Sequence, residues 1–147
     1  MATVPLRVVE ILTPKIGKPV FLRVFNNKVP AGFPSPADDY VEESLDLNQW
    51  LIKNKISTFI VEVQGDSMLF ELHSGDRLIV DRSLEPRHRD VVLACIDGDV
   101  TVKRLIIKEG KRYLLTPDNE DFPLIELNGN QELIIWGVVT YSIHKVR

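Results

Sequence analysis

The sequence has little cysteine and no long apolar run. Its one cysteine, Cys95, stands inside the apolar run 91–96. A single cysteine excludes an intrachain disulfide and fits a reducing compartment, and we expect a small buried apolar residue there. No run approaches the roughly 20 apolar residues of a transmembrane helix. Prolines and charges interrupt the N-terminus before a signal-peptide core can form. We therefore expect a soluble, cytoplasmic protein without membrane contact.

A strong charge of one sign is also missing. The formal net charge is -3, which argues against binding duplex DNA through bulk electrostatics. We therefore expect no direct sequence-specific DNA binding. The three histidines, His73, His88 and His144, are far apart among polar neighbours, and they lack the spacing of metal ligands. We interpret them as surface residues and expect no metal and no other cofactor.

The N-terminal part of the chain has the pattern of an extended arm, which we define as residues 1–31. Stretches 8–12 and 20–24 have the composition of short strands, with Pro14, Gly17 and Pro19 between them. Some 30 residues cannot close a core of their own, so the arm must dock elsewhere or remain mobile. The remaining residues, 32–147, are enough for one domain with a substantial core.

The boundary between the arm and the domain is expected in the segment Val29–Pro36. Its three prolines hold the backbone extended and prevent regular pairing with a neighbouring strand. At its centre two small residues, Ala31 and Gly32, stand side by side. Proteases bind their substrates as extended strands, so this bond is a candidate cleavage site. Composition alone favours the alternative, an ordinary linker.

Two short helices are predicted after the boundary. Ser35 can cap a helix that begins at Pro36, and Asp46 with Gln49 resembles a capping box that leads into residues 50–52. The acidic residues Asp38, Asp39, Glu42 and Glu43 are interpreted as a solvated helix face.

From residue 58 onward the chain has the pattern of strands, expected at 58–63, 77–81, 90–96, 100–108, 112–115 and 133–146. Asp97-Gly98 is a strong two-residue hairpin signal, and Glu109-Gly110 is a weaker one. Short connections without alternating helices favour a mostly β fold of antiparallel sheets.

The first candidate for chemistry is Ser67, in the motif Gly65-Asp66-Ser67-Met68 at the end of an expected strand. A corner of this kind exposes a hydroxyl and can direct the amides of Asp66 and Ser67 to one point, as an oxyanion hole requires. The motif by itself is also that of an ordinary turn.

The second candidate is Lys103. If Asp97-Gly98 is a two-residue loop, Lys103 pairs across from Val92 in an apolar strand. Burial lowers a lysine pKa and so supplies a neutral amine that can act as a base. An exposed edge-strand lysine is the alternative.

These motifs together resemble the LexA/UmuD family of self-cleaving peptidases. The resemblance runs from Ala31 to the C-terminus and rests on Ala31-Gly32, the Ser67 motif, residues 74–81, Lys103 within 97–104, residues 114–119 and the tail 136–139. Only 31 residues precede the expected cut, and they contain no helix-turn-helix, so the chain is similar to the UmuD branch. Its arm is longer than expected there, and Pro30 removes a backbone donor beside the cut.

The resemblance implies a LexA/UmuD-type peptidase domain, with short helices and an extended N-terminal arm, assembled as a homodimer. It implies cleavage at Ala31-Gly32 by a Ser67/Lys103 dyad, promoted by a RecA filament on single-stranded DNA during the SOS response. The product then joins a UmuC-like Y-family polymerase in error-prone translesion synthesis. The alternatives are a truncated LexA-like repressor and a polymerase scaffold that is not processed. A signal peptidase would need a membrane anchor.

Overall fold

We describe the protein from a computed structural model, for residues 7–19, 21–25, 42–65, 71–115, 125–126 and 133–147. The described chain divides into two compact units. One consists of Met1–Pro14 together with Asn54–Arg147, and the other of Lys15–Lys53. The expected boundary at residues 31 and 32 lies outside the described residues, so it stays a prediction.

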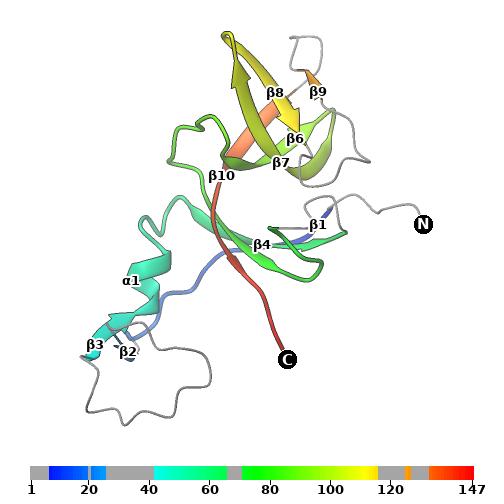
Figure 1. The fold of residues 1–147 in the computed structure, drawn as a ribbon. Coiled ribbons are helices and arrows are strands. Elements are labelled where there is room, and N and C mark those ends of the chain that lie inside the picture. The colour runs from blue at the N-terminus through cyan, green and yellow to red at the C-terminus, as the bar shows by residue number, and fades with distance from the viewer. Residues whose placement is uncertain (1–6, 20, 26–41, 66–70, 116–124, 127–132) are drawn as a thin grey trace. The chain divides into compact units, whose positions relative to one another are not determined.

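The larger unit is built on one antiparallel sheet (Figure 1). Its strand order within the described residues is β1-β4-β5-β10-β6-β7-β8-β9. The strands are β1 (Arg7–Leu12), β4 (Thr58–Gln64), β5 (Arg77–Asp81), β6 (Val91–Ile96), β7 (Asp99–Lys108), β8 (Lys111–Leu115), β9 (Ile125–Glu126) and β10 (Leu133–Ile143).

The sheet closes on itself because β1 also pairs with β7, through Arg7 and Thr101. Closure gives β1 a partner on each side, although β8 and β9 continue the sheet beyond β7. The long strand β10 lies between β5 and β6 in the barrel. Its first residues pair with β6 and its last residues pair with β5. Figure 1 shows β10 passing from orange to red between them. The predicted mostly β, antiparallel fold is confirmed.

The turns follow their local sequence. Ile96 pairs with Asp99, so Asp97 and Gly98 form a two-residue loop, and both have positive φ, 48° and 89°. This is the turn geometry that matches the twist of paired strands. Glu109 and Gly110 form a second loop of the same kind between β7 and β8.

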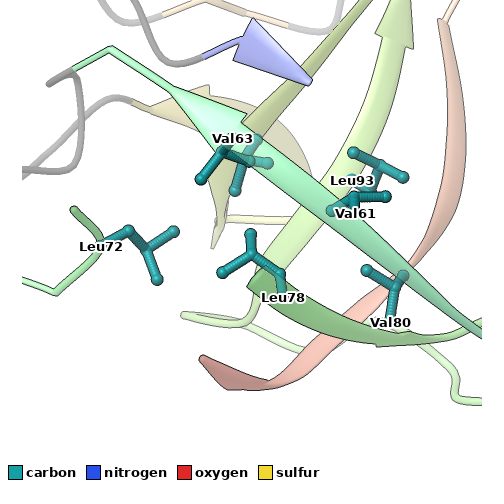
Figure 2. Packing of buried hydrophobic residues seen from close by; sticks show 7 residues of the cluster. Val61, Val63, Leu72, Leu78, Val80 and Leu93 are labelled. Atoms are coloured by element: carbon teal, nitrogen blue, oxygen red, sulfur yellow. The ribbon is translucent and has the colours of Figure 1, made fainter. Parts of the chain in front are cut away.

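Two apolar clusters form the core, and the alternation of side chains along the strands separates them. Figure 2 shows the first cluster, in which β4 and β5 pack against β6 and β7. Its buried members are Val61, Val63, Leu72, Leu78, Val80, Leu93 and Val102. The second cluster is formed by side chains on the opposite face of the strands. Its buried members are Val92, Ala94, Leu105, Leu114 and Val138. Cys95, expected to be buried, is only partly buried, because it pairs with Val100 close to the β6–β7 turn.

The smaller unit contains a β-hairpin and a short helix. β2 (Phe21–Phe25) pairs with β3 (Glu42–Asp46), and α1 (Leu47–Leu51) follows directly. Asp46 caps the helix as predicted, although its side chain accepts a hydrogen bond from the amide of Asn48 and not from that of Gln49.

The expectation for Glu42 and Glu43 was wrong. Both lie on a strand and not on a helix, because their backbone pairs with Phe25 and Val24 of β2. The predicted helix at Ser35–Pro36, with Asp38 and Asp39, lies outside the described residues. Both strands expected in the arm are confirmed as β1 and β2, and β1 docks on β4.

Candidate active site

Lys103 lies on β7, directly opposite Val92 of β6, as the two-residue turn predicted. Its side chain is buried, with 7% of the residue exposed, and Val92 is fully buried. On β7 the neighbour Val102 faces the first core cluster, so Lys103 faces the other side of the strand, together with Leu105. Both faces of β7 are therefore covered at this position.

Burial lowers the pKa of Lys103 below its ordinary value of 10.5. Removing an ammonium from water disfavours its charged form, which increases the neutral fraction at a given pH. A neutral amine is a proton acceptor, and a lysine with a lowered pKa is a recognised general base. The buried position of Lys103, expected from the apolar strand around it, thus has the electrostatics that a base requires.

The other residues predicted for the site lie outside the described residues. Asp66 and Ser67 belong to the segment 66–70, and Ala31 and Gly32 to the segment 26–41. The distance from Lys103 to Ser67 therefore stays a prediction. The described residues on either side of 66–70 show how that segment is attached to the barrel.

Both flanks of residues 66–70 are held at the end of β4. On the N-terminal side, the amide of Gly65 donates to Ser74 Oγ at 3.2 Å, and Gly65 has a positive φ of 109°. On the C-terminal side, the amide of Gly75 donates to the carbonyl of Val63 at 2.7 Å. Leu72 is buried and directed toward Leu78 (Figure 2). The described residues that flank 66–70 are thus fixed to each other and to the core.

An ion pair links the residue that follows 66–70 to the strand that carries Lys103. Glu71, the first described residue after 66–70, pairs with Arg104, which follows Lys103 on β7. Arg104 Nη1 also donates to the carbonyl of Arg89 at 2.7 Å. Sequence reasoning missed this link, since 33 positions separate residues 71 and 104 and no local pattern marks the pair.

The histidines are exposed, as expected, but they are not scattered in space. His73 and His144 both lie at Asp76, because β10 pairs with β5 and brings the C-terminal residues to the turn before β5. His88 is elsewhere, and its Nδ1 accepts from the amide of Ile107 at 2.9 Å. One carboxylate therefore lies beside two of the three imidazoles, which their sequence spacing did not indicate.

Among the described residues, no helix has the length and apolar character needed to cross a membrane.

Comparison with known proteins shows the family to which this sequence belongs. The family model described as Peptidase S24-like matches residues 23–140. Protein SamA of Salmonella typhimurium is 48% identical over 125 residues, which cover 84% of this chain and 86% of that protein. Protein MucA of Escherichia coli is 42% identical over 118 residues, covering 79% and 80%.

A LexA repressor, from Alcanivorax borkumensis, is 38% identical over 112 residues, but these cover only 53% of that repressor against 76% of this chain. The match to SamA and MucA, in contrast, spans most of both chains. Peptidase S24 is a family of self-cleaving serine peptidases. The predicted relationship is confirmed: this chain belongs to the Peptidase S24-like family, as a UmuD-like member.

Proposed function

We propose that this protein is a UmuD-like serine peptidase that cuts its own chain between Ala31 and Gly32. Ser67 is the nucleophile and Lys103 the general base. The observation that carries the proposal is the burial of Lys103: the residue is 7% exposed on an apolar strand, and burial lowers the pKa of its amine. The next residue on its strand, Arg104, binds Glu71 just beyond the segment that contains Ser67. Membership of a self-cleaving serine peptidase family supports the same reading.

In the proposed reaction, neutral Lys103 takes the proton of the Ser67 hydroxyl as its oxygen attacks the carbonyl carbon of Ala31. The amides of Asp66 and Ser67 stabilise the oxyanion. Lys103 then returns the proton to the Gly32 nitrogen as the peptide bond breaks. Water hydrolyses the resulting ester at Ser67, with Lys103 again accepting the proton. Because the substrate is part of the chain, the reaction is effectively unimolecular, which favours this bond over foreign peptides.

Cleavage at this bond would divide the chain into the arm, residues 1–31, and a peptidase and dimerisation domain, residues 32–147. The arm includes β1, which pairs with β4 and closes the barrel through Arg7. After the cut, β1 would be held only by noncovalent pairing. If β1 then dissociates, the edge of β4 that it covered becomes available for pairing with a strand of another protein.

The proposed setting is the SOS response to DNA damage in the cytoplasm. A RecA filament on single-stranded DNA shifts the chain toward the conformation that cleaves itself. The cleaved protein acts as a homodimer and as the accessory subunit of a UmuC-like Y-family polymerase in translesion synthesis. The UmuD-like relatives, which match most of the chain, support this setting.

The direct test is to incubate the purified full-length chain with activated RecA filament and to measure the products by intact-protein mass spectrometry. We expect fragments that end at Ala31 and begin at Gly32. Ser67→Ala and Lys103→Ala should each abolish the cut. Lys108→Ala, which removes an exposed lysine from the same strand, should cleave like the wild type. Normal processing in either dyad variant refutes the proposed dyad.

Two further measurements separate the alternatives. A truncated LexA-like repressor would shift an operator DNA in a gel without damage signals. A polymerase scaffold would bind a UmuC-like polymerase and dimerise, yet the wild-type chain would remain intact with RecA filament. Absence of cleavage by the wild type, at any pH up to about 10, would therefore contradict the peptidase function.

A further inference from the structure

A second group of polar side chains meets where the C-terminal end of β10 approaches the turn before β5. His73 and Asp76 lie on that turn, and His144 directly follows β10. One potential ligand atom from each residue lies within 4.8 Å of the other two. The group forms because Ile143 of β10 pairs with Arg77 of β5, which places their neighbours His144 and Asp76 side by side. None of these residues takes part in the proposed peptidase reaction.

Asp76 is the fixed member of the group. Its side chain is 1% exposed, and its Oδ2 accepts from the backbone amide of His73 at 2.8 Å and from Ser142 Oγ at 3.0 Å. Its other oxygen, Oδ1, lies 2.6 Å from Nδ1 of His144. Hydrogen bonds from the surrounding protein orient a metal-binding carboxylate and limit its motion. Asp76 is therefore held with Oδ1 toward the imidazole of His144.

The two imidazoles are accessible. The side chains of His73 and His144 are 52% and 50% exposed, and their ring centroids are 4.6 Å apart with an interplanar angle of 37°. Nδ1 of His73 lies 3.6 Å from Asp76 Oδ2. Both rings thus border the same carboxylate at the surface, where an ion can enter without opening the core.

We propose that His73, Asp76 and His144 form a binding site for a divalent transition-metal ion, with zinc as the ion that suits it. Two imidazole nitrogens and one carboxylate oxygen are a known zinc donor set, which leaves one coordination position for water. Zinc bonds of about 2.0–2.2 Å need the ligand atoms separated further than the present His144–Asp76 hydrogen bond. Small rotations of the half-exposed rings supply that separation. Binding of the ion replaces the contact between His144 Nδ1 and Asp76 Oδ1.

The bound ion would tie the C-terminal residues after β10 to the turn before β5, within one compact unit. It would add a crosslink to β-pairing that ends at Ile143. The inference does not depend on the proposed peptidase function, because zinc binding and thermal stability are measured without any cleavage.

The test is isothermal titration calorimetry of untagged full-length protein with zinc chloride. We expect one equivalent to bind, and zinc to raise the melting temperature by mass action. His144→Ala and His73→Ala should each weaken binding by at least about tenfold, since loss even of a supporting group costs about 10- to 100-fold. The matched control is His88→Ala, which removes an exposed histidine that lies apart from the group and should bind zinc like the wild type.

Because both rings are half-exposed, the histidine variants should fold like the wild type. Asp76→Asn changes a buried hydrogen-bonded group, so its zinc binding is used only as a supporting measurement. Cobalt provides an independent signature, because four-coordinate cobalt with nitrogen and oxygen ligands absorbs strongly in the visible range, and His144→Ala should remove that band. Absence of zinc binding by the wild type overturns the site. Equal binding by the wild type, His73→Ala and His144→Ala overturns it as well, and leaves only a hydrogen-bonded cluster.

Discussion

Lys103 lies directly opposite Val92 across the β6–β7 ladder, and the two residues share the face of the sheet that carries the second core cluster. Directly opposite residues in an antiparallel pair bring their Cβ atoms to about 4.5–5.5 Å. Lys103 therefore starts beside a fully buried valine, with Leu105 two positions further along the same face. The lowered pKa of Lys103 comes from its burial at this position, and the first two predictions depend on it.

The first prediction concerns the pH dependence of self-cleavage without RecA. The reaction needs neutral Lys103, whose pKa burial lowers below 10.5. The rate should increase as pH rises and reach half of its maximum at a pH below that ordinary value, where half of the amines are neutral. Product formation measured between pH 6 and 10 checks this. Lys103→Arg, which cannot lose its proton, should cleave at least about 100-fold more slowly at every pH. A flat wild-type profile would contradict a titrating lysine.

The second prediction concerns stability. Because the folded-state pKa of Lys103 is lowered, the unfolded chain binds more protons between that pKa and 10.5. The contribution of Lys103 to the free energy of unfolding therefore rises with pH between these two pKa values. Below the folded-state pKa, the buried ammonium lowers the free energy of unfolding. Lys103→Met should raise the urea midpoint at pH 7, and its advantage should disappear above about pH 10.5. A variant less stable than the wild type at pH 7 would show that the amine has stabilising partners that outweigh its desolvation.

A third prediction concerns the ion pair between Glu71 and Arg104. Their side chains are 49% and 17% exposed, so Glu71→Gln should lower the free energy of unfolding by no more than about 1 kcal/mol. If the pair positions the segment that contains Ser67, the same change should slow RecA-promoted cleavage several-fold. The control is Glu85→Gln, at an exposed position outside the strands. Unchanged cleavage in Glu71→Gln would show that the pair has no positioning role.

The sequence predicted those features that depend on neighbours along the chain. Asp97-Gly98 adopts the positive φ angles that its residue types favour, and that turn alone sets the pairing of Lys103 with Val92. Most strands were located for the same reason, since alternation and turn residues are local signals.

Features formed by distant segments were missed. The short strand β9, the closure of β1 on β7, the Glu71–Arg104 pair and the meeting of His144 with Asp76 all depend on the topology of the barrel. β3 was assigned to a helix face because its acidic residues resemble one, whereas pairing with β2 decided its structure. Tertiary contacts override local propensity in such segments.

A fourth prediction concerns Asp81, a buried carboxylate at the end of β5. Its Oδ1 accepts from Ser57 Oγ at 2.8 Å, from the Ser83 amide at 2.8 Å and from Ser83 Oγ at 2.6 Å. Burial raises the pKa of Asp81, but the hydrogen bonds from Ser83 and Ser57 outweigh it and hold the pKa below 3.8. The stabilisation is therefore complete above the unfolded-state pKa and is lost as pH falls toward the lower folded-state pKa.

Asp81→Asn should lower the free energy of unfolding at pH 7 by about 1–3 kcal/mol, because it weakens hydrogen bonds to a charged acceptor. The difference from the wild type should shrink below about pH 4, where the wild-type carboxylate begins to gain its proton. Urea unfolding at pH 7, 5 and 3 measures both effects. A difference that stays constant over this range would exclude the charge of Asp81 as its source.

The last prediction concerns Gly137, next to the irregularity at which β10 shifts register against β6. A Cβ atom at Gly137 would lie 2.7 Å from Val80 Cγ1 and 3.0 Å from the carbonyl oxygen of Asp81. The valine methyl belongs to the packed core and the carbonyl to a neighbouring strand, so neither moves at little cost. Gly137→Ala should therefore destabilise the protein by about 1–3 kcal/mol. Gly17→Ala, at a glycine with nothing within 4 Å, should change stability by no more than about 0.5 kcal/mol. Equal urea midpoints for the two variants would show that β10 and β5 can separate enough to admit a methyl group.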